Sequence, residues 1–82
     1  MDEKSMEKMF TIEIIDMVVN DALELRGLLK EAMVNILDED FAVTNKRLTT
    51  CNDLADGITK SAHRINHRIG TLKEISGTNL KV

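Results

Sequence analysis

The sequence predicts an all-α fold in which two long antiparallel helices form a helical hairpin. Three observations support this prediction. The chain of 82 residues has no proline and only two aromatic residues, and straight-chain residues with good helix propensity supply most of its apolar content. Apolar residues recur at alternating intervals of three and four along both halves of the chain. One short polar segment separates the two halves.

The first helix is expected at about residues 5–37, with Ser5 as its N-cap. Its apolar residues follow a heptad pattern without interruption. They are Ile15, Val18, Ala22, Leu25, Leu29, Ala32 and Ile36. Gly27 lies in the middle of this helix, where glycine costs about 1 kcal/mol relative to alanine. A kink at Gly27, which would give a three-helix bundle, is therefore the alternative fold.

The second helix is expected at about residues 41–75, after a turn at residues 38–40 that reads Asp-Glu-Asp. Asp40 is placed to cap this helix, and Ser76–Gly77 is a typical helix end that leaves residues 76–82 as a tail. The heptad pattern continues through the second half of the chain. Its members are Phe41, Thr44, Leu48, Cys51, Ala55, Ile58, Ala62, Ile65, Ile69 and Leu72.

Charge separates between the two predicted helices. Residues 1–40 contain eleven acidic and four basic side chains, whereas residues 41–82 contain three acidic and seven basic ones. The first half thus has a net charge of −7 and the second of +4, for a total of −3. Opposite charges favour pairing of the two helices within one chain, because pairing of like helices would be repulsive.

The first helix has more apolar surface than one heptad stripe requires. A hairpin of two such helices buries one stripe on each, so the remaining apolar flank needs a further contact. We expect a homodimer that forms an antiparallel four-helix bundle, in which the whole chain is one domain, residues 1–82. The residues expected to mediate self-association are Ile12, Ile15, Val19, Leu23, Leu28, Met33 and Leu37.

A basic segment stands out in the second helix, where no acidic residue occurs from Gly57 to Lys73. We call its main cluster the basic face, in which four residues lie at outer positions and Arg68 flanks the heptad stripe. It consists of Lys60, His63, Arg64, His67 and Arg68. One interpretation is a solvated helix face whose arginines pair with carboxylates of the acidic helix. The other is a docking surface for an acidic or phosphate-bearing partner.

Metal, cofactor and catalytic chemistry find little support in the sequence. His63 and His67 are four residues apart and share a helix face, but the cations around them would repel a metal ion. Cys51 lies on the heptad stripe, where a cysteine acts as a small buried apolar residue. The chain has no glycine-rich phosphate loop and none of the common hydrolase motifs. We therefore predict no enzymatic activity, no metal and no cofactor.

The composition favours a cytoplasmic regulator or adaptor that binds another protein. The single cysteine suits a reducing compartment, and the first residues are polar and charged, without an apolar signal core. In size and composition the chain is similar to anti-sigma factors, secretion chaperones and phage antiholins, an analogy that no motif carries. The alternative is a nucleic-acid accessory protein using the basic residues of segment 60–73. The acidic total and the lack of aromatic stacking residues argue against nucleic acid, and the charges Glu13 and Asp16 argue against membrane lipid.

Overall fold

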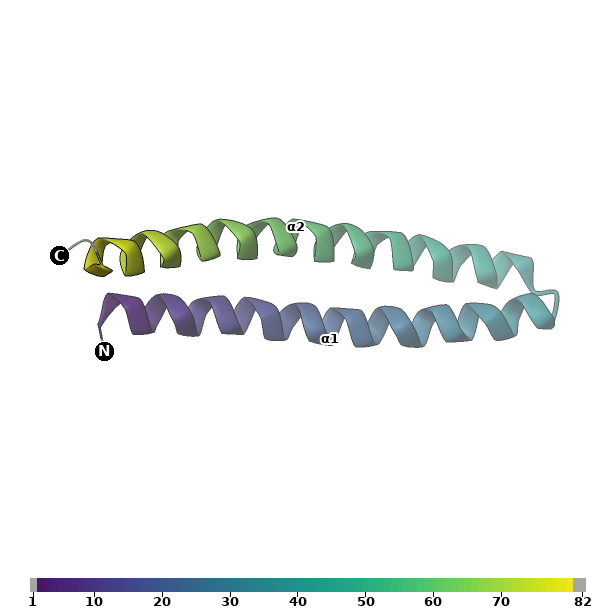
Figure 1. Ribbon diagram of the computed structural model, residues 1–82. Coiled ribbons are helices and arrows are strands. Elements are labelled where there is room, and N and C mark those ends of the chain that lie inside the picture. The colour runs from purple at the N-terminus through teal and green to yellow at the C-terminus, as the bar shows by residue number, and fades with distance from the viewer. Residues whose placement is uncertain (1, 81–82) are drawn as a thin grey trace.

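The computed structural model describes the backbone of residues 2–80 and the side chains of residues 2–76. Two helices, α1 (Glu3–Leu37) and α2 (Phe41–Leu80), form an antiparallel hairpin (Figure 1). The hairpin is a thin rod that measures 65 × 18 × 13 Å, and the start of α1 and the end of α2 lie together at the end opposite the turn (Figure 1). We call this end the open end. The predicted all-α hairpin is confirmed.

Helix α1 begins at Glu3 and is capped by Asp2, so the predicted cap at Ser5 is wrong. The carboxylate Oδ1 of Asp2 accepts a hydrogen bond of 2.7 Å from the backbone N–H of Ser5. This bond, with a second from the Ser5 side chain, lowers the pKa of the exposed Asp2 carboxyl below its ordinary value. Serine and aspartate cap equally well, and with Asp2 as the cap the helix begins at Glu3, two residues before Ser5.

Helix α1 runs without a break through Gly27, so the alternative three-helix bundle does not form. A Cβ atom at this position would meet nothing within 4 Å. The glycine therefore is not required for a close approach of another element. Its cost of about 1 kcal/mol is small beside the packing of the helix against α2, which keeps the helix continuous.

A Schellman motif ends α1 and makes the tight turn. The backbone N–H of Asp40 donates to the carbonyl of Asn35 at 2.9 Å, and that of Glu39 donates to the carbonyl of Ile36 at 3.0 Å. Glu39 has a φ of 59°, in the left-handed region that glycine usually occupies at this point. The turn thus satisfies carbonyl groups at the end of α1 and reverses the chain within residues 38–40.

Helix α2 begins as predicted but ends later. The carboxylate of Asp40 accepts a hydrogen bond of 3.3 Å from the backbone N–H of Val43, which confirms its role as the cap. The helix continues through the expected stop at Ser76–Gly77 to Leu80. Glycine permits a helix end but does not impose one, because it also adopts helical angles. Of the predicted tail 76–82, residues 81–82 lie outside the described residues.

The contact surface between the helices, which we call the seam, is rotated from the predicted stripe. Every second member of that stripe, such as Val18, Leu25 and Cys51, does lie in the seam. At the other positions the seam residue is the one that directly precedes the predicted member in the sequence. The α1 seam contains Thr11, Ile14, Val18, Asp21, Leu25, Leu28, Ala32 and Asn35. The α2 seam contains Thr44, Arg47, Cys51, Leu54, Ile58, Ser61, Ile65, Arg68 and Leu72. Polar side chains thus occupy positions that the apolar pattern did not predict.

The core of the hairpin is correspondingly thin. Among the described side chains, only Ile14, Ala32 and Cys51 are buried apolar residues, and no large side chain is completely buried. Thr11 and Thr44 are also buried, and their hydroxyls donate to backbone carbonyls one turn earlier, at 2.7 and 2.9 Å. A two-layer domain normally surrounds its core on more sides than this hairpin does.

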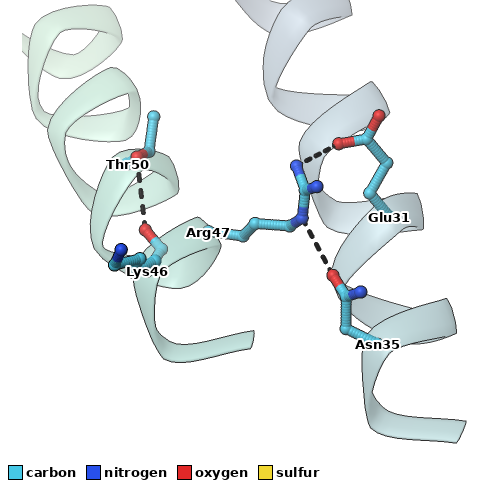
Figure 2. Close-up of polar contacts among 5 residues, drawn as sticks. All are labelled: Glu31, Asn35, Lys46, Arg47 and Thr50. Atoms are coloured by element: carbon cyan, nitrogen blue, oxygen red, sulfur yellow. Dashed lines mark hydrogen bonds and ion pairs between the residues drawn. The ribbon is translucent and has the colours of Figure 1, made fainter. Parts of the chain in front are cut away.

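Arg47 shows how the seam accommodates a charged residue (Figure 2). Its side chain crosses from α2 to α1, where Nε donates to Oδ1 of Asn35 at 2.8 Å and the guanidinium pairs with the carboxylate of Glu31. The long side chain keeps its charged end at the rim, so that only its stem covers the seam. The pairing joins the acidic helix to the basic helix, as the charge distribution predicted.

Candidate functional site

The basic face lies on α2 near the open end. It borders an open groove of about 500 Å³, which we call the basic groove. Four of its five predicted members line the groove. The lining residues are His63, Arg64, His67 and Arg68, with Thr71 from the same helix and Glu7 from α1. The structure therefore brings the predicted cluster together in one concave surface, with the exception of Lys60. That residue pairs with Asp56 at 3.1 Å, one turn away on the same helix.

Arg68 is held by α1 and has a structural contact in addition to its place in the groove. Its guanidinium pairs with the carboxylate of Glu7 at 2.8 Å, and it lies 5.7 Å from the centre of the Phe10 ring. Both charged side chains are about two-thirds covered, which strengthens the pair relative to a fully exposed one. One arginine of the basic face thus does pair with the acidic helix, as the first of the two interpretations predicted.

The other side chains of the groove present polar and basic groups to solvent. Within the described part of the chain, His63, Arg64 and His67 form no ion pair, and all three are exposed. An arginine and two imidazoles offer several N–H donors in a small area. This arrangement suits a ligand with several acceptor oxygens, such as a cluster of carboxylates.

An apolar hollow adjoins the basic groove at the open end. It has a volume of about 200 Å³ and is lined by Met6, Met9, Phe10 and Glu13 of α1. Phe10 belongs to this hollow and also lies over Arg68 of the groove, so the two depressions are neighbours. The sequence pattern alone does not connect these residues with the basic face. That connection requires the register of the two helices.

The residues predicted for self-association do not form one stripe. Leu28 is half-buried in the seam, where it faces α2. Six others are exposed, with Leu23 and Leu37 on the outer side of α1. The remaining four are Ile12, Ile15, Val19 and Met33, which share one side of that helix by their spacing.

A longer apolar surface, which we call the apolar face, borders the seam on both helices. In each helix it consists of every seventh residue, directly after a seam position. Its members are Ile15, Ala22, Leu29 and Ile36 of α1 and Phe41, Leu48, Ala55, Ala62 and Ile69 of α2. All nine are exposed, and the six large ones have exposed fractions of 39–60 %.

The apolar face and the basic groove lie on opposite sides of the hairpin. The seam of each helix alternates between two kinds of position, exemplified by Leu28 and Arg47 for one kind and by Ala32 and Ile65 for the other. In an antiparallel pair, the residues that directly follow the first kind lie on one side of both helices. The residues that directly precede the second kind lie on the opposite side. Phe10, Arg64 and Thr71 directly precede positions of the second kind, and they meet around Arg68 at the groove. Leu29 and Leu48 directly follow positions of the first kind and therefore share the far side.

The remaining candidate groups of the sequence lie apart. Cys51 is a free, buried thiol in the seam, distant in sequence from the histidines. Among the residues that the structure describes, no three His, Cys, Asp or Glu side chains are grouped as ligands of a metal ion would be. Likewise, neither helix, over its described length, has an apolar stretch sufficient to cross a bilayer.

Comparisons of the chain with protein-family models, with curated proteins and with solved structures give no match.

Proposed function

We propose that the protein is a small helical regulator or adaptor that acts by binding another protein and not by catalysis. The exposed apolar surface supports this proposal. Among the described residues, sixteen large apolar side chains are exposed, on a chain of only 82 residues. Exposed apolar surface of this extent on a small protein indicates interaction sites.

The proposed partner site is the open end of the hairpin, where the basic groove meets the apolar hollow. The contact of Phe10 with Arg68 is the observation on which this assignment rests, because it joins the two depressions. Arg64, His63 and His67 supply donors on one side, while Met6 and Met9 supply adaptable apolar contacts on the other. A site of this kind combines charge steering with apolar affinity.

An acidic amphipathic helix is the partner segment that fits this site best. Its carboxylates would meet Arg64 and the two histidines, and its apolar side would meet the methionines and Phe10. Helices in grooves are a common mode of recognition, and methionine-lined surfaces adapt to different partner side chains. Glu7, the one acidic side chain among the described residues that line the groove, is already paired with Arg68, so it does not compete with the partner's carboxylates for Arg64.

A designed acidic amphipathic peptide, with glutamate and leucine at helical spacing, tests the site directly. We expect it to shift the backbone amide resonances of residues 6–10 and 63–71, with affinity that falls as salt is raised. Arg64→Glu should weaken binding at least tenfold. Lys46→Glu removes a cation near the turn of the same helix and is the matched control, so its binding should equal that of the parent protein.

Arg68 is unsuitable for this comparison because its substitution would also disturb the contacts with Glu7 and Phe10. Equal binding by the Arg64→Glu and Lys46→Glu variants would refute the proposed site. Retardation of a DNA or RNA fragment at low salt, without any response to the peptide, would instead support the nucleic-acid alternative.

A further inference from the structure

We infer that two copies of the chain associate through their apolar faces into a four-helix bundle, with the turn of each hairpin directed toward the open end of the other. The inference goes beyond the proposed function and does not depend on it. The apolar face and the basic groove lie on opposite sides of the hairpin, so a second copy on the apolar face leaves the groove accessible.

The exposed area of the single hairpin supports a second copy as the occupant. The chain exposes 6329 Å², whereas a compact monomer of 9.2 kDa would expose about 4,900 Å². The excess of about 1,400 Å² is larger than the roughly 800 Å² that each partner contributes to a standard stable interface. A face-to-face dimer along most of the rod would cover an area of this size.

The apolar face is also kept free of the charges in the adjoining seam. Arg47 and Arg68 both lie in the seam directly before members of the face. Arg47 pairs with Glu31, and Arg68 pairs with Glu7 and contacts Phe10. Glu31 and Phe10 directly precede seam positions, so both arginines are directed to the side of the basic groove. The face itself contains only aliphatic side chains and one phenylalanine.

Side-chain size along the face favours the opposed orientation of the two turns. The register set by the two interhelical ion pairs places Leu29 level with Leu48, and Ala22 level with Ala55. The half near the turn is therefore bulky, and the half toward the open end contains three alanines. Opposed hairpins whose two-fold axis lies between these two levels set Leu29 and Leu48 of each copy against Ala22 and Ala55 of the other, which fills space evenly. Hairpins with their turns together would place Ala22 and Ala55 of both copies at one level. They would also place Leu29 and Leu48 of both copies against one another near the turns, where the side chains would be crowded.

The rims of the face support the same orientation. The rim residues lie beside the face around each helix, on the side away from the seam, three residues before a face residue or four after one. On α1 they are Ile12, Val19, Arg26 and Met33. On α2 the corresponding residues are Asn45, Asn52, Thr59, Asn66 and Lys73. With opposed turns, α1 packs on its own copy and α2 on its own copy. The repulsion expected between like helices does not oppose this contact, because the face and rim of α1 from Ile12 to Ile36 contain no acidic residue. The rim of α1, which is apolar except for Arg26, then meets its own copy, and the polar rim of α2 meets its own copy. Turns placed together would instead bury apolar side chains against asparagines.

Solution mass and a matched pair of leucine substitutions test the association. We expect the parent protein to sediment at twice its chain mass at micromolar concentration. Leu29→Glu, in the apolar face, should give a monomer, and Ala55→Glu should do so independently from the other helix. Leu23→Glu changes an exposed leucine on the outer side of α1, so this variant should remain a dimer. A monomeric parent protein, or equal masses for the Leu29→Glu and Leu23→Glu variants, would overturn the inference.

A spin label at the turn tests the orientation. In a Cys51→Ala background, Glu39→Cys provides one labelling site for each chain. Opposed hairpins place the two labels more than about 40 Å apart, since the helices rise 1.5 Å per residue from the middle of the bundle to each turn. Hairpins with their turns together would bring the labels within about 20 Å, given helix spacings near 10 Å, and would overturn the orientation. The Arg64→Glu variant should dimerise normally, so failure of the partner site and failure of the dimer can be distinguished.

Discussion

Glu39 is the residue at which the backbone departs most clearly from what its side chain prefers. Its φ of 59° lies in the left-handed region, which places Cβ close to the following carbonyl oxygen. Its carboxylate also lies beyond the C-terminus of α1, where the helix dipole disfavours negative charge. The turn nevertheless forms, because the hydrogen bonds from Glu39 and Asp40 to α1 hold the backbone in this conformation.

Replacing this residue with glycine should stabilise the protein. We expect Glu39→Gly to raise the free energy of unfolding by about 1 kcal/mol, because glycine adopts the left-handed conformation without the steric cost. Urea denaturation monitored by circular dichroism measures the change. Glu39→Ala removes the same charge but keeps a Cβ, so it should recover little of this gain. An equal gain for both variants would attribute the effect to charge instead of backbone conformation.

Single residues at helix ends were only partly predictable from the sequence. Asp40 was identified correctly as a cap because it alone precedes the second apolar pattern at the right spacing. At the start of α1, Asp2 and Ser5 are both good caps, three residues apart, and the sequence does not rank them. The structure shows that Ser5 is instead the donor to the Asp2 carboxylate.

At the scale of the helices, the predicted pattern located both elements and the turn but misplaced the contact between them. The heptad stripe of the sequence follows the apolar residues, including Leu48, Ala55 and Ala62. The hairpin instead packs on a neighbouring line that includes Arg47 and Ser61. Sequence reasoning rejects an arginine in a seam, because it does not reveal that Glu31 and Asn35 lie opposite to receive it.

The observed and predicted stripes are compatible if both are buried in the assembled protein. Each helix would then use three neighbouring heptad positions, a wider stripe that is typical of helices in bundles. Two of these positions form the seam, and the third forms the apolar face. The basic groove could not be predicted in the same way, because Glu7 and Phe10 are far from Arg68 in the sequence and meet it only through the hairpin.

Helix α1 should tolerate, and gain from, an alanine at Gly27. The new Cβ would meet nothing within 4 Å, so the substitution adds no clash and removes the entropic cost of glycine in a helix. We expect Gly27→Ala to raise the free energy of unfolding by about 0.5–1 kcal/mol. Gly57→Ala, at an equally open position of α2, should behave alike. A loss of stability at Gly27 alone would show that a helix of another copy approaches the backbone there.

At the scale of the whole molecule, folding and association should be coupled. A hairpin with three buried apolar residues among its described side chains has little core of its own, so most apolar contacts would be completed by the second copy. We expect the melting temperature to rise by about 4 °C for each tenfold increase in protein concentration, as mass action requires for a dimer of this size. Differential scanning calorimetry over a dilution series measures this. A melting temperature independent of concentration would mean that the hairpin is stable alone.

The start of α1 and the end of α2 lie together at the open end, which bears on how the protein can be labelled or fused (Figure 1). A fluorescent protein attached before α1 or after α2 would stand near the basic groove and would compete with a partner for that space. The turn at residues 38–40 lies at the other end of a 65 Å rod and is joined to the helices by a short reversal. A reporter inserted there on flexible linkers would leave the groove accessible, so partner binding should be stronger than in a fusion next to the groove.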